Sequence, residues 1–294
     1  MTVMWKKTML ILLVLSLPQN YIFSQGKSFL WKIEYRGGAS YLLGSVHTLK
    51  QEHYPLNATI ETAFTQTEAL AVEADISSPN AMEAGMQLLQ KGMYTGDEKL
   101  EKNISRKTMN LLQKKLQELN MENMGFSQFK PWMVAMVLLQ TELAKMGFDP
   151  NLGIDKYFLD KAANKKEVVE LEGVEFQVKL LESFTKSESE AFLLSTILEI
   201  DQLKTELDKM IEAWMAGNIH VMEELLTGYV KKNPEVEALY RKMNDDRNVG
   251  MVQKIESYLK SGKRYFVIAG AAHMIGKNGI VQTLKNKGYT VTQL

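Results

Sequence analysis

The sequence contains no cysteine, few prolines and no excess of either charge. Without cysteine the chain has no disulfide framework, zinc ribbon, thiolate nucleophile or iron–sulfur cluster. The 6 prolines and 19 glycines are too few for a fibrous or low-complexity protein. Basic and acidic residues number 35 each, which argues against nucleic acid as a partner, because phosphate binding needs a basic surface. His-Glu-x-x-His, phosphate-loop, dinucleotide and nucleophile-elbow motifs are also missing.

The first residues have the layout of a secretory signal peptide. Two lysines precede an apolar run from Met9 to Leu17, and a small residue, Ser24, stands at a suitable cleavage point. We expect residues 1–24 to be removed and residues 25–294 to form a single exported domain, periplasmic or secreted. A bilayer span takes about 20 residues, so membrane contact is expected only if this shorter segment stays uncleaved as an anchor.

Strand-like segments gather at the two ends of the mature chain, and helical periodicity fills the middle. A chain that is 45% hydrophobic can bury a substantial core. The predicted fold class is α/β (α+β), with a small mixed β-sheet built from both chain ends and a helical insertion at approximately 80–260. Asn57 is expected to cap a helix and Pro234 to stand at the start of another. The expected strands are Ser28–Tyr35 and Ser40–Val46, which form a hairpin, then Ala69–Glu73, Glu167–Leu171, Arg264–Ala269 and Tyr289–Gln293, and the longest expected helix is Glu188–Ala216.

A Gly-x-x-His motif occurs twice, once near each end of the mature chain. Gly44 precedes His47, Gly270 precedes His273, and each motif follows an apolar strand. A glycine at this place lets the chain turn sharply or approach a ligand closely. Ligand sites in open α/β sheets gather at the carboxyl ends of strands, so both imidazoles are expected in one cleft. Together they could bind a divalent metal or act as an acid and a base.

A metal site would need a third ligand, and Glu73 is the best candidate. This glutamate ends the apolar strand that closes the first of the two motif units. The corresponding strand at the end of the chain carries no carboxylate, so the predicted site is asymmetric. The pattern leaves open whether Glu73 is a ligand or a general base.

Six short motifs carry a resemblance to a known family. They are Leu42–His47, Leu70–Asp75, Gly153–Asp155, Val169–Gly173, Asp246–Asn248 and Val267–His273. In this order they resemble the TraB/GumN family of bacterial proteins, which includes TIKI-type metalloproteases and PrgY-like pheromone-shutdown proteins. Two positions depart from the family pattern, with Gly173 in place of the usual Thr and Asp246 in place of Glu.

The resemblance implies a fold akin to those of erythromycin esterase-like and ChaN-like proteins. It also implies a metal-dependent hydrolase that acts on a peptide or protein substrate. His47, Glu73 and His273 would lie at the centre of its site, with a divalent ion such as Mn²⁺, Co²⁺ or Zn²⁺. The alternative function is a non-catalytic binder that holds a peptide signal or haem in the same cleft.

Three further residues receive roles only through this resemblance. Arg247 would stabilise an oxyanion or hold a substrate carboxylate, and Asn248 would orient it. Asp155 would accept a hydrogen bond from a histidine N–H group. The alternatives are a helix-face pair for Arg247 and Asn248, and capping or charge balance in the first helical turn for Asp155.

Overall fold

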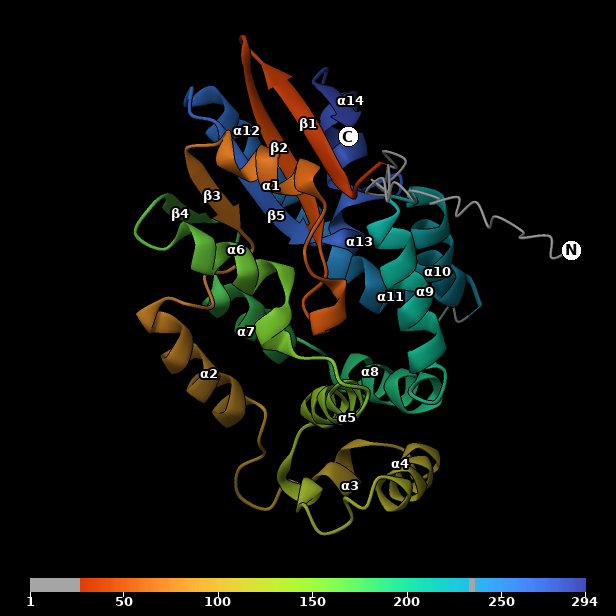
Figure 1. The fold of residues 1–294 in the computed structure, drawn as a ribbon. Helices are drawn as coiled ribbons and strands as arrows, with labels where there is room; N and C mark the ends of the chain where they lie inside the picture. Colours follow the sequence, from red (N-terminus) through yellow and green to blue (C-terminus); the bar gives the residue numbers. More distant parts are fainter. Residues whose placement is uncertain (1–26, 233–235) are drawn as a thin grey trace, which may run out of the picture.

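The computed structural model describes residues 27–232 and 236–294. Within these ranges six strands form one mixed sheet in the order β4-β3-β5-β2-β1-β6. Figure 1 shows the part of the sheet from β4 to β1. The strands are β1 (Leu30–Tyr35), β2 (Gly38–Ser45), β3 (Ala69–Val72), β4 (Glu167–Glu170), β5 (Tyr265–Gly270) and β6 (Thr290–Gln293). The expected signal segment and Pro234 lie outside the described residues. None of the described helices has the length and apolarity needed to span a bilayer.

The predicted hairpin is formed by β1 and β2. The two strands are antiparallel, and Tyr35 is paired with Gly38 at the turn. The residues between them, Arg36 and Gly37, both have positive φ angles, 47° and 80°. Tight turns of this kind match the right-handed twist of the strands that they connect, which fixes the register of the hairpin.

The two ends of the chain meet in the middle of the sheet, as predicted. Near the N-terminus, β2 runs parallel to β5 from the C-terminal part, and β6 pairs antiparallel with β1. On the other side of β5, β3 runs parallel to it and to β4. Strand β4 comes from within the mostly helical middle segment and forms one edge of the sheet.

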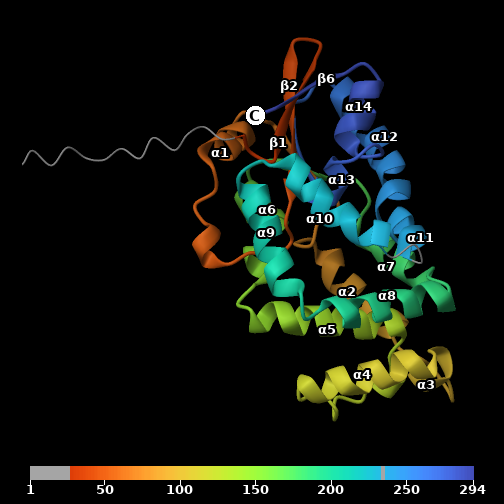
Figure 2. The ribbon, with the colours of Figure 1, turned by 90° about the vertical axis from the view of Figure 1, so that its right-hand side faces the viewer.

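Helices cover both faces of this sheet (Figure 2). They include α1 (Ala58–Thr65) and α6 (Ile154–Ala162) on one face, and α12 (Asp246–Lys260) and α14 (Ile280–Asn286) on the other. The rings of Phe64, Phe158 and Phe266 meet with centroids 4.9–5.4 Å apart. Tyr258 of α12 stacks on Tyr265 at 4.9 Å. Because successive strand residues face opposite sides, neighbouring residues of β5 anchor a helix on each face.

A second, smaller core lies among helices of the middle segment. The remaining helices there are α2 (Pro79–Lys91), α3 (Leu100–Asn103), α4 (Arg106–Glu118), α5 (Pro131–Lys145), α7 (Val174–Glu182), α8 (Lys186–Glu199), α9 (Leu203–Met215), α10 (Ile219–Lys232) and α11 (Glu237–Tyr240). Leu112 of α4, Leu138 of α5 and Leu193 of α8 are buried together in this core. Figure 2 shows α3 and α4 as a separate layer, with α5 and α8 between them and the rest of the molecule.

The helix predictions are confirmed at one point and wrong at another. Asn57 caps α1, since its side chain accepts a hydrogen bond from the backbone N–H of Thr59. The single helix expected over Glu188–Ala216 is instead two helices, α8 and α9, separated by a turn at residues 200–202. Ile197 packs in the second core and Ile211 in the main core. The apolar periodicity continues through the turn, but the two halves bury their faces against different partners, and a straight helix cannot reach both.

Candidate functional site

The two Gly-x-x-His segments leave the sheet at the same edge, because β2 and β5 are parallel neighbours. Ser45 is paired with Gly270 in their register. Gly44 lies inside β2, where a Cβ atom would fall 2.5 Å from Cδ1 of Phe29 and 3.1 Å from Cα of Ala271. Its lack of a side chain lets the short helix α13 (Ala271–Met274) pack directly on β2. This close packing brings the two histidine-bearing segments together.

His47 stands in the loop after β2 and is the accessible histidine of the pair. Its side chain is 65% exposed, and its Nδ1 atom lies 2.8 Å from Oδ2 of Asp155, in the first turn of α6. The negative charge of Asp155 raises the pKa of His47 to about 9. Burial raises the pKa of the Asp155 carboxyl, but contact with His47 outweighs burial and lowers it. The two side chains therefore form an ion pair near neutral pH.

His273 is the buried histidine, only 5% exposed, in helix α13. Its Nδ1 atom lies 2.7 Å from Oδ1 of Asn248 in α12. Asn248 in turn donates from Nδ2 to the carbonyl oxygen of Asn278 at 2.9 Å, which fixes the orientation of its amide. Burial lowers the pKa of His273 to about 4, so its imidazole is neutral at neutral pH.

Glu73 directly follows β3 and is 5% exposed. Its Oε1 atom accepts a hydrogen bond from the backbone N–H of Gly270 at 2.6 Å and lies 3.9 Å from Nε2 of His273. Its Oε2 atom accepts from Nη2 of Arg247 at 2.6 Å. Burial by itself raises the pKa of the Glu73 carboxyl, but His273, His47 and Arg247 together hold it below its ordinary range.

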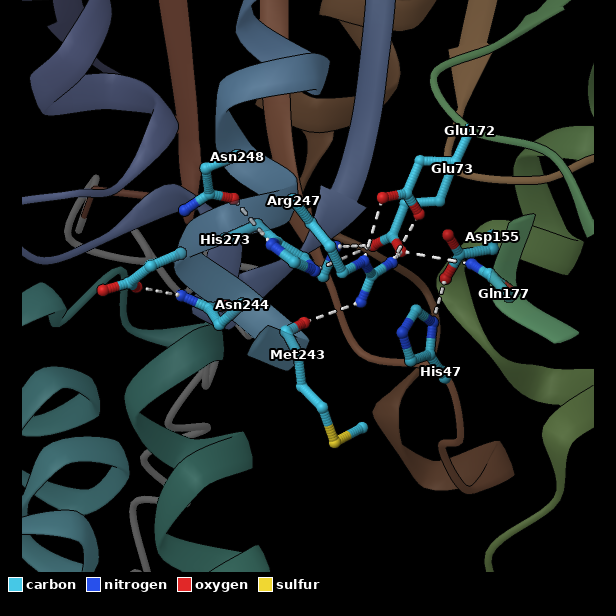
Figure 3. Close-up of polar contacts among 12 residues, drawn as sticks. His47, Glu73, Asp155, Glu172, Gln177, Met243, Asn244, Arg247, Asn248 and His273 are labelled. Atoms are coloured by element: carbon cyan, nitrogen blue, oxygen red, sulfur yellow. Dashed lines mark hydrogen bonds and ion pairs between the residues drawn. The ribbon is translucent and has the colours of Figure 1, made fainter. Parts of the chain in front are cut away.

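Arg247, in the first turn of α12, joins two carboxylates (Figure 3). Besides its contact with Glu73, it donates from Nε to Oε1 of Glu172 at 2.9 Å and from Nη2 to Oε2 of Glu172 at 2.6 Å. Its Nη1 atom donates to the carbonyl oxygen of Met243 at 2.9 Å, in a π-helical turn that precedes α12. A guanidinium has five N–H donors, and four of them are occupied here by protein atoms.

The structure therefore brings together the residues that the sequence singled out. Asn248 is buried and the side chain of Arg247 is 11% exposed, so neither belongs to a solvated helix face. Two residues of the cluster had no role assigned from sequence. Glu172 belongs to one of the six motifs, but nothing in the sequence around it indicates a role, and in the structure it binds Arg247. Nε2 of Gln177, on α7, lies 3.4 Å from Oε2 of Glu73.

Three side chains face one point beside Gly270. A Cβ atom built on Gly270 would lie 3.4 Å from Oε1 of Glu73, 3.5 Å from Nε2 of His47 and 3.6 Å from Cδ2 of His273. Once His47 gives up its proton, as metal binding requires, the three carboxylates of Glu73, Asp155 and Glu172 and the guanidinium of Arg247 leave a net charge of −2. The Asp155 and Asn248 contacts occupy the Nδ1 atoms and leave both Nε2 atoms without a hydrogen bond among the residues that the structure describes.

This donor set fits a divalent cation in type and in charge. Two imidazoles and one carboxylate are common ligands of Mn²⁺, Co²⁺ and Zn²⁺, and second partners on Nδ1 are typical of metal-bound histidines. The distances between these donor atoms are longer than those between ligands that surround a bound ion. Across residues 27–232 and 236–294, no three His, Cys, Asp or Glu side chains stand at metal-binding spacing. Two donors on one ion lie about 3 Å apart, so the 3.9 Å between Glu73 and His273 would have to shorten.

Comparison with known proteins finds relatives that match most of the chain. A family model described as the TraB/PrgY/gumN family matches residues 29–293. A protein of Shigella flexneri named "Uncharacterized protein YbaP" is 29% identical over 257 residues, covering 84% of this chain and 88% of its own length. A protein of Escherichia coli (strain K12) with the same name is 29% identical over 256 residues, covering 83% and 87%. An uncharacterized protein of Treponema pallidum (strain Nichols) is 20% identical over 291 residues, covering 90% and 82%. No solved structure matches the chain significantly.

Proposed function

The chain belongs to the TraB/PrgY/gumN family, and from this premise we propose that it is a metal-dependent hydrolase of peptide bonds. The observation that carries the proposal is the convergence of His47, His273 and Glu73 on one point beside Gly270. The side chains come from three different strand ends or their following segments, and each is held by a separate hydrogen bond. A hydrolytic metal site requires donors held by the surrounding protein in this way, and here the 3.9 Å between Glu73 and His273 would shorten when the ion binds.

His47, His273 and Glu73 would hold the ion, the histidines through Nε2. A bound divalent ion lowers the pKa of a coordinated water and polarises the substrate carbonyl. Glu73 serves better as a ligand than as a general base, because its neighbours hold its pKa below the ordinary range. An efficient general base has a pKa near the working pH. We therefore expect Glu73→Gln to lose the metal, whereas loss of activity with the metal retained would indicate a base.

The two histidines differ in what they contribute. His273 is buried and neutral, and Asn248 accepts its Nδ1–H, so Nε2 keeps its lone pair toward Glu73. His47 is exposed, and Asp155 favours its protonated form, so this imidazole must release a proton before Nε2 can act as a ligand. The substrate is expected to approach from the side of His47, because the other two side chains are buried.

The location proposed for this activity is outside the cytoplasm. The support is the layout of residues 1–24, with two lysines, a short apolar run and a small residue at the cleavage point. An exported hydrolase would meet peptide or protein substrates in the periplasm or the medium. Amino-terminal sequencing of the protein recovered from cells tests this directly, because cleavage after Ser24 would leave Gln25 as the first residue.

The decisive experiment measures metal content and peptide hydrolysis on the same samples. The mature protein is loaded separately with Mn²⁺, Co²⁺ and Zn²⁺ and examined by mass spectrometry, beside the His47→Ala, His273→Ala double variant. The matched control is His220→Ala, since His220 lies on α10 with its side chain 82% exposed. We expect about one equivalent of metal in wild type and control, none in the double variant, and hydrolysis only where metal is bound. Absence of specific metal from the wild type would refute the proposal and favour a binder of peptide or haem, which a Soret band after haem addition would reveal.

A further inference from the structure

We infer that Glu172 is a positioning residue that fixes Arg247 and, through Arg247, the carboxylate of Glu73. The inference rests on the proposed function for its kinetic consequence, but its geometric content is independent of the reaction. It concerns a buried carboxylate for which the proposed chemistry has no direct use. The side chain of Glu172 is only 5% exposed and is not among the three groups nearest to the point beside Gly270.

The parallel pairing of β3 and β4 places the two glutamates side by side. Val72 is paired with Glu170, and the backbone N–H groups of Glu172 and Gly173 both donate to the carbonyl oxygen of Glu73 at 2.9 Å. Gly173 then has a φ of +101°, and the chain turns away into α7. The backbone thus places the side chains of Glu73 and Glu172 at neighbouring strand ends. Without a cation between them, these would be two negative charges buried side by side, which is unfavourable.

Arg247 resolves this conflict by binding both carboxylates. Its Nε and Nη2 atoms contact both oxygens of Glu172, and the second hydrogen on Nη2 reaches Glu73 at 2.6 Å. The two contacts to Glu172 fix the plane of the guanidinium, because a two-pronged pair permits little rotation. With the plane fixed, Oε2 of Glu73 has one favourable position, and Oε1 is turned toward Gly270 and His273.

The same contacts argue against a substrate-binding role for Arg247. Four of its five N–H donors already have acceptors among Glu172, Glu73 and Met243. One donor on Nη1 remains, so Arg247 could bind a substrate carboxylate through two hydrogen bonds only by releasing one of these acceptors. Arg247 therefore orients the carboxylate of Glu73. Glu172 in turn holds the guanidinium of Arg247 at the angle that this contact requires.

A double-mutant cycle with kinetic readout tests the positioning role. We expect Glu172→Gln to lower kcat by about 10- to 100-fold, the usual effect of losing a partner of a site residue. KM should stay within about twofold of wild type, because no contact to substrate is removed. In an Arg247→Ala background the same substitution should change kcat by less than about twofold, since Glu172 acts through Arg247. The matched control is Glu175→Gln, three residues further along the chain on α7, where the side chain is 76% exposed and pairs with Lys179.

A crystal structure of the Glu172→Gln variant supplies a readout that does not depend on activity. We expect the contact between Nη2 of Arg247 and Oε2 of Glu73 to lengthen beyond hydrogen-bond distance. An unchanged contact, or equal losses of kcat in the wild-type and Arg247→Ala backgrounds, would overturn the inference. If the wild type hydrolyses no peptide, the proposed function fails, and the position of Glu73 in this crystal structure still decides the role of Glu172. If Glu172→Gln does not fold, Glu172→Asp replaces it, because it keeps the charge but is too short to hold both nitrogen atoms at once.

Discussion

Asn248 determines which nitrogen of His273 faces the candidate site. Oδ1 of Asn248 lies 2.7 Å from Nδ1 of His273, and its Nδ2 is committed to the carbonyl oxygen of Asn278. Because the amide can only accept at Oδ1, the neutral imidazole carries its hydrogen on Nδ1. The Nε2 lone pair is thereby directed toward Glu73, 3.9 Å away. His47 has a carboxylate, Asp155, in the equivalent place, so the two histidines of the repeated motif have different charges.

Replacing Asn248 with alanine should destabilise the fold. The variant leaves the buried Nδ1–H group of His273 without an acceptor, which costs about 1–3 kcal/mol of unfolding free energy. Urea denaturation measures the change. The control is Asn110→Ala on the exposed side of α4, for which a change within about 0.5 kcal/mol is expected. Equal stability of the two variants would show that the contact to His273 contributes nothing.

A methyl group on Gly270 should block the site without unfolding the protein. The backbone at Gly270 has φ −50° and ψ 143°, which alanine adopts freely, and the nearest atoms to its Cβ lie 3.4 Å or more away. The methyl would occupy the point that Glu73, His47 and His273 face. We expect Gly270→Ala to lower kcat/KM by about 100-fold with an unchanged circular dichroism spectrum.

The comparison for this variant is Gly85→Ala on α2, where an added Cβ would meet no atom of the described part of the chain within 4 Å. This control should retain activity and gain stability slightly, because alanine is the better helix former by about 1 kcal/mol. Full activity of Gly270→Ala would mean that the substrate and any bound ion lie elsewhere.

The two histidines should impose opposite pH dependences on stability. The folded-state pKa of His47 is raised to about 9, so the folded protein binds more protons between pH 6.5 and 9, and stability falls as pH rises through this window. The folded-state pKa of His273 is lowered to about 4, so the unfolded chain binds more protons between pH 4 and 6.5, and stability falls as pH drops through that window.

Substituting either histidine should therefore remove its own contribution to the pH dependence of stability and leave that of the other histidine. Compared with wild type, His47→Gln should lose less stability between pH 6.5 and 9, and His273→Gln should lose less between pH 4 and 6.5. Urea unfolding across this pH range measures both differences. Wild type and variant curves that run parallel over these windows would contradict the assigned charges.

Metal binding near neutral pH should release a proton. His47 is protonated at pH 7, because Asp155 raises its pKa to about 9, and a metal binds only the deprotonated imidazole. Titration calorimetry with Mn²⁺ in two buffers of different ionisation enthalpy should show release of about one proton per ion at pH 7. Release of none at this pH would exclude His47 as a ligand. Affinity should rise with pH, since the competing proton is progressively removed.

Local features of the sequence were sufficient to predict much of the scaffold. The four residues from Arg36 to Ala39 between two apolar runs predicted the hairpin, and the structure narrows the turn to Arg36 and Gly37, which have the positive φ angles that such turns require. The two Gly-x-x-His motifs after apolar strands predicted that both chain ends would share a sheet, and β2 and β5 are parallel neighbours. These predictions succeed because strand alternation, turn chemistry and strand-end position are determined by neighbouring residues.

The tertiary structure alone decided the contacts that link distant residues. Arg247 and Glu73 are 174 positions apart, and nothing near either residue indicates that the guanidinium is shared with Glu172. The expected helix over 188–216 failed for the same reason, since two cores compete for one periodic face. Side-chain pairing over such separations depends on which elements the whole fold brings side by side. The sequence by itself therefore determined which residues stand at the strand ends, and only the packed fold determined their partners, their burial and hence their charge.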